Sequence, residues 1–136
     1  CTDLEVVEPF KNRFGMLEIP VFMEDGGFLF RQRSTTDLQL FDEALRKPGL
    51  KVILIHPMHL AINTPDFGYM VDIKRSLDRT SWNNLSDDEL SRLRSSRIGI
   101  ADLVADILEL ADVLGVPITS LGCVAADQSS LAVQRA

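Results

Sequence analysis

The sequence predicts an α/β fold of about three parallel strands with flanking helices. Three apolar stretches, at residues 16–23, 50–55 and 116–125, have the length and composition of strands. Helical patterns lie between them, and apolar strands that alternate with helices pair in parallel. Three such strands make a small sheet with two open edges, so we expect the chain to be part of a larger sheet.

The first predicted strand, MLEIPVFM, contains Pro20. Proline has no backbone N–H for a neighbouring strand, so we expect this strand at a sheet edge or with a local irregularity. EDGG at residues 24–27 predicts a turn, because two adjacent glycines let the backbone bend sharply. The second strand, LKVILI, is apolar on both faces and should be covered on both sides.

Three segments have helical patterns. In TTDLQLFDEALRKPG, apolar residues recur at helical spacing after Thr36, which can cap the helix, and a Pro-Gly pair ends it. SDDE at residues 86–89 is a capping box that opens a short helix ending near Arg97. IGIADLVADILELADVLG places one apolar stripe on a helix over residues 100–114.

The remaining segments concern the organisation of the chain. Residues 60–85 contain helix breakers and no sustained period, which predicts a long insertion loop, and residues 126–136 form a tail. The chain starts at Cys1 and not at a methionine. We therefore expect residues 1–136 to be a single domain or a fragment, with a processed product or a lipoprotein anchored through Cys1 as alternatives.

Composition narrows the function classes. The 136 residues are 46% hydrophobic and 25% charged, as in globular proteins. The net charge of −6 argues against a nucleic-acid backbone as the main partner, and no apolar run approaches the ~20 residues that span a bilayer. Cys1 and Cys123 form neither a disulfide framework nor a metal set, so we expect the cytoplasm, with envelope anchoring as the alternative. The oligomeric state stays open.

Both histidines of the chain follow one strand, in KVILIHPMHLAIN at residues 51–63. Functional groups of α/β proteins collect at the carboxyl ends of parallel strands, where we expect His56 beside Glu24 and Asp25. A carboxylate next to an imidazole favours the protonated ring, so such a histidine can donate a proton near neutral pH. His59 would join them only if the intervening residues form a turn.

A structural role for the histidines is the competing interpretation, because a histidine at a strand end commonly serves as a hydrogen-bonding group. As a metal pair, His56 and His59 fall short of the three or four ligands that zinc requires. Asp25 or Glu24 as a further ligand is a lesser alternative.

EIPVFMEDGG, KVILIHPMHLAINT and VPITSLGCVA together resemble the C-terminal half of polysaccharide deacetylases, the carbohydrate esterases of the NodB-homology group. The resemblance covers about Met16 to Val124. It is strongest to a branch found among surface-polysaccharide biosynthesis proteins, in which a strand ends in His-Pro-x-His-x-x-x-Asn.

This resemblance implies a partial (β/α) barrel that removes acetyl groups from sugar polymers with a divalent metal, zinc or similar. By the same resemblance, Leu54-Ile55-His56 is the late Leu-x-His motif, with His56 as the catalytic acid and Leu54 lining the acetyl group. Asp25 is the carboxylate that tunes the active site, and Glu24 is the less favoured candidate for that place. The base and the metal ligands precede the matching part in the family, so we expect none of them in this chain.

Further substrate contacts follow from the same family. His59 and Asn63 belong to the motif of the branch and face the substrate, and Tyr69 and Lys74 reach it from the predicted insertion. The function implied is metal-dependent hydrolysis of acetyl groups from a bacterial surface glycan or its precursor. The alternative is a non-catalytic α/β module that binds carbohydrate or a protein partner.

Overall fold

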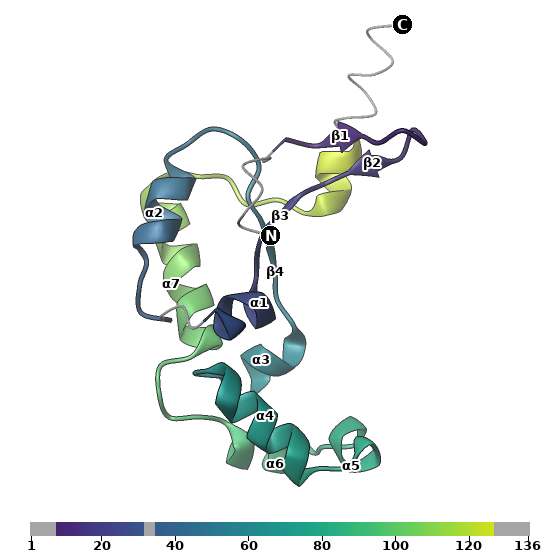
Figure 1. Ribbon diagram of the computed structural model, residues 1–136. Helices are drawn as coiled ribbons and strands as arrows, with labels where there is room; N and C mark the ends of the chain where they lie inside the picture. Colours follow the sequence, from purple (N-terminus) through teal and green to yellow (C-terminus); the bar gives the residue numbers. More distant parts are fainter. Residues whose placement is uncertain (1–7, 32–34, 127–136) are drawn as a thin grey trace, which may run out of the picture.

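The computed structural model describes residues 8–31 and 35–126 (Figure 1). Its central feature is a parallel pair of strands, β3 (Val21–Glu24) and β4 (Val52–Leu54). Val21 lies opposite Val52 and Glu24 opposite Leu54, with an irregularity in register after Val21. The predicted parallel pairing of the first two strands is therefore confirmed, and both strands end at the same edge.

The predicted first strand is divided in two by Pro20. Before it, β2 (Leu17–Glu18) pairs antiparallel with β1 (Phe10–Lys11) in a short ribbon, and after it β3 joins β4. The missing N–H of proline explains the break. The two pairs are separate sheets.

Residues 24–27 do not form the predicted turn. Glu24 is the N-cap of helix α1 (Asp25–Phe30), and its carboxylate accepts hydrogen bonds from the backbone of Gly26 and Gly27. An acidic N-cap satisfies amide groups that a helix leaves unpaired at its start, and this outweighs the poor helix propensity of two glycines.

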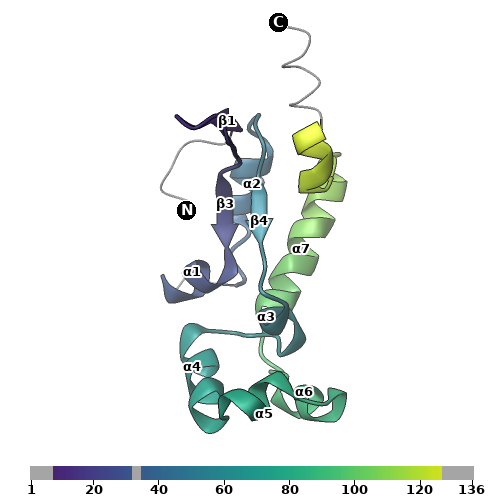
Figure 2. The same ribbon diagram turned by 90° about the vertical axis from the view of Figure 1, so that its right-hand side faces the viewer.

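Two further helices cover the strand pair. Helices α2 (Gln39–Leu45) and α7 (Ile100–Val113) pack side by side against it, as the two views in Figures 1 and 2 show. Both were predicted, although α2 begins three residues after Thr36. Their apolar faces join those of α1 and β3 in one cluster, which consists of Met23, Phe28, Leu29, Phe41, Ile100, Leu103 and Ile107.

The predicted loop at 60–85 is wrong, because this segment is largely helical. It holds the end of α3 (Pro57–Ala61) together with α4 (Phe67–Ser76) and α5 (Arg79–Asn83), followed by α6 (Asp87–Leu93). Asp66 and Asp78 cap α4 and α5 through their side chains, and the predicted capping box of α6 is present. These helices are short, and so their hydrophobic periods are too brief to stand out in the sequence.

The third predicted strand is also absent from the part of the chain that the structure describes. Residues 121–126 are helical, and Ser120 accepts hydrogen bonds from Cys123 and Val124 at their start. Ile118 and Leu121 are exposed, at 67% and 51%. An apolar run becomes a strand only beside a pairing partner, and here the hydroxyl cap of Ser120 directs a helix instead.

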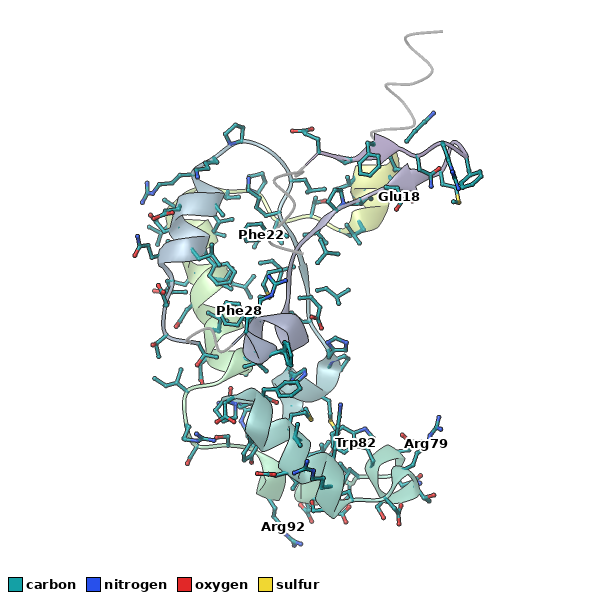
Figure 3. The ribbon with its side chains drawn as sticks, in the orientation of Figure 1. Glu18, Phe22, Phe28, Arg79, Trp82 and Arg92 are labelled. Carbon is teal, nitrogen blue, oxygen red and sulfur yellow. The ribbon has the colours of Figure 1, made fainter. Side chains whose placement is uncertain are left out.

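A second, smaller apolar cluster holds α4 and α6 together. Its buried members are Ile62, Met70 and Ile73, with Trp82 and Leu90 among the partly buried residues around them. Figure 3 shows Phe22 and Phe28 on the side of the strands that faces α2, whereas Arg79 and Arg92 project outward from the helical end.

Among the described residues, none of the helices has both the length and the apolar character required to cross a bilayer. Cys1 and most of the predicted tail lie outside the described residues, and so does the proposed anchor.

Candidate functional site

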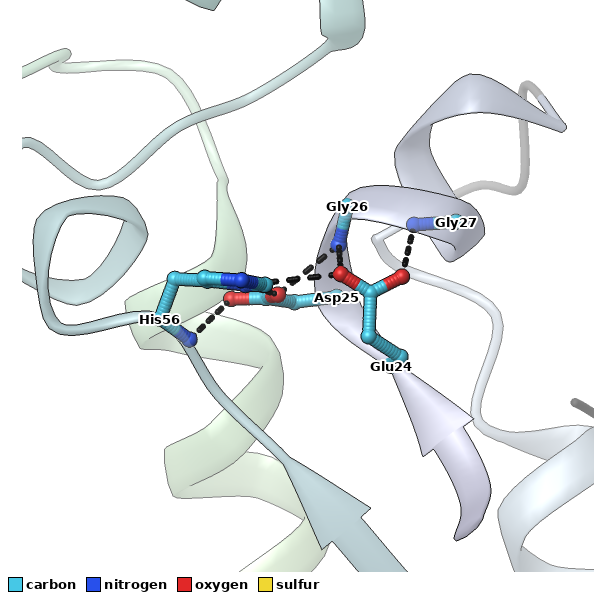
Figure 4. Close-up of polar contacts among 5 residues, drawn as sticks. All are labelled: Glu24, Asp25, Gly26, Gly27 and His56. Atoms are coloured by element: carbon cyan, nitrogen blue, oxygen red, sulfur yellow. Dashed lines mark hydrogen bonds and ion pairs between the residues drawn. The ribbon is translucent and has the colours of Figure 1, made fainter.

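The ends of β3 and β4 bring the predicted acidic and imidazole groups together. Glu24 ends β3 and Asp25 begins α1, while His56 follows β4 and is the N-cap of α3. Because the strands are parallel and adjacent, these residues meet at one edge of the pair (Figure 4).

Asp25 holds His56 at two points. Its Oδ2 accepts the backbone N–H of His56 at 2.8 Å, and its Oδ1 lies 2.5 Å from the imidazole Nδ1. The Oδ1 atom also accepts the backbone N–H of Gly26. Asp25 is fully buried, whereas 53% of the His56 side chain is exposed. The contact therefore joins a fixed carboxylate to a ring that reaches solvent.

Glu24 adds a second carboxylate near the same ring. Its Oε1 lies 3.4 Å from Nδ1 of His56, and its two oxygens accept the backbone N–H groups of Gly26 and Gly27. A Cβ at either glycine would come within 2.8 Å of a Glu24 oxygen. The two glycines thus leave room for Glu24 to fold back over the start of α1, which directs its negative charge toward His56.

His59 joins the site through the first turn of α3. Pro57 occupies the start of this helix, and the backbone N–H of His59 donates to the carbonyl of His56 at 3.0 Å. Residues three apart on a helix lie on neighbouring positions, and the two imidazole rings are 5.7 Å apart in an edge-on arrangement. The turn on which their convergence depended is therefore present.

His59 differs from His56 in its surroundings. It is only 8% exposed, and its Nδ1 has no hydrogen-bond partner among the described residues. Burial lowers the pKa of His59 below its ordinary value of 6.5, and the nearby carboxylate of Asp25 opposes this shift. The neutral imidazole, which has a free lone pair, is therefore favoured.

Asp25, His56 and His59 form a possible metal-binding triad. One donor atom from each lies within 4.8 Å of the others. The family resemblance implies metal ligands outside this chain, and the sequence offers Asp25 or Glu24 only as a lesser alternative for a further ligand beside the two histidines. The signal that could have found the triad is Pro57, because proline favours the first position of a helix and a helix brings His59 back beside His56.

The other predicted substrate contacts have varied positions. Leu54 is 44% exposed at the end of β4. Asn63 is buried and has a positive φ of 47°, which asparagine tolerates better than most residues. Its Nδ2 donates to Asp102 and to the Arg97 carbonyl, and its Oδ1 accepts from Ala101. The Asn63 amide therefore ties α3 to the start of α7.

Tyr69 and Lys74 both lie on α4 and not on a loop. The Tyr69 hydroxyl donates to the carbonyl of Leu93 at 2.6 Å, which connects α4 to the end of α6. Lys74 is exposed, and its charge contributes to the lowered pKa of His59. The charge of Lys74 therefore acts on His59, one member of the triad.

The chain shares its fold with part of one solved structure. This is a candidate polysaccharide deacetylase involved in O-antigen biosynthesis from Bordetella bronchiseptica, which matches with a TM-score of 0.56 and 20% sequence identity. The match covers 76% of this chain and 40% of that one, so the chain spans less than half the length of its structural neighbour. No protein-family model and no curated protein matches the chain.

Proposed function

We propose that this chain belongs to a protein that hydrolyses acetyl groups from a bacterial surface glycan or its precursor in the cytoplasm. The observation that carries the proposal is the contact between the buried Asp25 and the half-exposed His56, at the carboxyl ends of two parallel strands. The structural likeness to a candidate polysaccharide deacetylase supports it. In this proposal the two strands are part of a larger (β/α) barrel.

His56 is the proton donor in this proposal, and Asp25 positions it. With Nδ1 directed to Asp25, the ring offers its Nε2 to a leaving amine or alcohol. The second bond of Asp25, to the backbone of His56, sets the direction of the ring before substrate binds. A group held in this way contributes through general acid catalysis, which typically accelerates a reaction about 10²- to 10⁴-fold.

The metal ligands of the reaction are proposed to lie outside this chain, as the family resemblance implies. A divalent ion supplies polarisation of the acetyl carbonyl and activation of water when it is bound. The residues of this chain provide the proton and part of the substrate surface.

Leu54, Glu24 and Lys74 are the proposed substrate contacts that have exposed or half-exposed side chains. Leu54 precedes His56 by two residues in the chain and would contact the acetyl methyl group. His59, Asn63 and Tyr69 stay predictions as substrate contacts, and the last two also have the structural hydrogen bonds described above.

Acetate release tests the proposal, with the protein encoded by the complete reading frame and acetylated oligosaccharides as substrates. His56→Gln should lower kcat by about 10²-fold or more and leave the circular dichroism spectrum unchanged, because the ring is half exposed. Arg92→Gln, an exposed change on α6, is the matched control. Full activity in the His56→Gln protein would remove His56 from the mechanism, and sugar binding without acetate release would favour a non-catalytic module.

Asp25→Asn separates positioning from chemistry. The variant keeps an oxygen for the backbone N–H of His56 but removes the negative charge beside the ring. We expect a lower kcat, an altered pH profile and little change in KM. A change confined to KM would contradict a positioning role.

A further inference from the structure

We infer that Asp25, His56 and His59 bind one divalent transition-metal ion of the zinc type, at a site separate from the catalytic metal that the family resemblance implies. The inference concerns residues of this chain alone. Its binding step does not depend on the proposed deacetylation.

The geometry is close to that of a three-ligand site. The donor atoms of the three residues lie within 4.8 Å of one another. Ligands of a tetrahedral zinc ion are about 3.3 Å apart, as metal–ligand distances of ~2.0–2.1 Å require. The 2.5 Å contact between Asp25 and His56 therefore opens slightly if the ion takes its place, while the His59 nitrogen moves inward.

His59 provides the second observation. It is more than nine-tenths buried, and its Nδ1 is without a hydrogen-bond partner among the described residues. A buried nitrogen that lacks a hydrogen-bond partner has given up its contact with water without a replacement, which destabilises the folded chain. A metal ion that uses this histidine as a ligand gives the ring a strong interaction in place of the missing one.

The donor set selects the class of ion. Two imidazoles and one carboxylate suit zinc, copper, nickel and iron, whereas magnesium and calcium favour oxygen ligands. Glu24, with an oxygen 3.4 Å from His56, adds a second negative charge that attracts a cation. The half-exposed ring of His56 leaves an entry path from solvent.

Occupancy of this site has a consequence for the proposed function. Zinc bound to one ring nitrogen of His56 excludes the imidazolium form, in which both nitrogens carry protons. The ring then keeps at most one N–H, which is a much weaker acid than the imidazolium, so the ion and the catalytic proton compete for the same ring. Zinc added beyond the amount needed for catalysis should therefore inhibit acetate release. This consequence rests on the proposed function, while the binding of the ion does not.

Binding is measured on the chain itself by adding ZnCl₂ and recording the imidazole signals by NMR. The sequence contains only two histidines, so each signal can be assigned by one substitution. We expect both signals to shift together and to saturate at one zinc ion per chain. Saturation at a higher ratio, or a shift of only one ring, would overturn the site.

Substitutions locate the ion. His56→Gln, His59→Gln and Asp25→Asn should each weaken zinc binding by at least about 10- to 100-fold, the loss that even outer-shell partners produce. Cys123→Ser removes an exposed thiol, and Glu109→Gln removes an exposed carboxylate on α7. Both are controls that should bind as the unsubstituted chain does.

Unchanged binding in His56→Gln, which should fold because the ring is half exposed, contradicts the inference even if the two buried variants fail to fold. If the complete protein releases no acetate even without the inhibitory excess of zinc, while this chain binds zinc stoichiometrically, the proposed function is contradicted and the metal site stands.

Discussion

The strand pair with α1, α2 and α7, which we call the sheet region, buries seven described apolar side chains in one cluster. The helical region, consisting of α4, α5 and α6, has a cluster with three buried members, one of them contributed by the end of α3. The helical region depends more on the side chains that cap its own helices, those of Asp66, Asp78 and Ser86. Distant parts of the chain thus stabilise the first region, and neighbouring residues stabilise much of the second.

The candidate site lies where the two regions meet. Helix α3 follows β4 and is joined to α7 and to the segment after α6 by backbone bonds, from Ser95 to the Ile62 carbonyl and from Ile100 to the Thr64 carbonyl. Asp25 begins α1, which packs in the larger apolar cluster, whereas the two histidines lie at the start of the short helix α3 at the boundary. Substitutions in either region therefore test how firmly the fold holds Asp25 and the two histidines in place.

The largest effect is expected in the sheet region. Phe41 is 1% exposed and touches the rings of Phe22 and Phe28. Phe41→Ala should cost about 3–5 kcal/mol of unfolding free energy, because it leaves a cavity among packed side chains. Urea denaturation measures this value. Phe14→Ala, at a ring that is 70% exposed, is the control, and a similar loss for both would show that the cluster contributes little.

A smaller and more local effect is expected in the helical region. Met70 is 4% exposed, and many of its neighbours are only partly buried. Met70→Ala should cost about 2 kcal/mol, at the low end for buried methionine, because the surroundings can collapse into the space. Hydrogen exchange should accelerate in α4 and α6 while β3 and β4 keep their protection. Equal acceleration everywhere would show that the two regions unfold as one.

The boundary between the regions has its own test at Gly99. A Cβ there would lie 2.3 Å from the backbone oxygen of Asn63, which cannot move without disturbing both α3 and α7. Gly99→Ala should lower the unfolding free energy by about 1–3 kcal/mol, because the added methyl group overlaps this backbone. At Gly122 the nearest atom would be 3.7 Å away, so Gly122→Ala is the matched control. If the two variants melt at the same temperature, the close approach at Gly99 is unimportant.

The difference between the two regions also explains which elements the sequence could predict. The segments of β4 and α7 have long apolar patterns, and the capping box of α6 has a specific signature, so these elements were found. The apolar run at 116–125 predicts a strand, and this prediction is wrong because composition does not reveal whether a pairing partner exists. The helices α4 and α5 were missed because their caps, Asp66 and Asp78, are common residues in loops as well.

The sequence likewise predicts one part of the candidate site and not the other. The approach of Asp25 to His56 followed from the rule that parallel strands end at one edge, and pairing of β3 with β4 bears that rule out. The burial of His59 and of Asn63 could not be foreseen, since it depends on α3 and on the packing of α7 against it. The local sequence shows which reactive side chains follow the two strands. The burial of His59 and Asn63 depends on how distant segments pack at the boundary between the two regions, so it requires the fold.

A modest effect is expected from the capping box of α6. The Ser86 side chain accepts from the backbone of Glu89, and the Glu89 carboxylate accepts from the backbone of Ser86. Ser86→Ala should lower the unfolding free energy by about 1 kcal/mol. It should also accelerate amide hydrogen exchange, mainly within α6. Ser91→Ala on the same helix is exposed and should stay within about 0.5 kcal/mol of the unsubstituted chain. Equal stability of the two variants would assign α6 to packing and not to its cap.

The smallest effect is a pH dependence at the boundary. Hydrogen bonds from Asn63 and from the backbone of Gly99 hold the pKa of Asp102 below its ordinary value of 3.8. The folded chain therefore binds its proton at lower pH than the unfolded chain does. The resulting stabilisation is complete above the ordinary pKa, and it is lost as the pH falls through the lowered one.

Asp102→Asn removes this titration while keeping the size of the side chain. Unfolding free energies of the two proteins, measured between about pH 5 and pH 2, should differ most above pH 4 and converge on the acid side. Convergence would show that the boundary is held partly by charge, in contrast to the apolar contacts within each region. A constant difference across the pH range would instead assign the role of Asp102 to shape and hydrogen bonding, and the charge of its carboxylate would not contribute to holding the boundary.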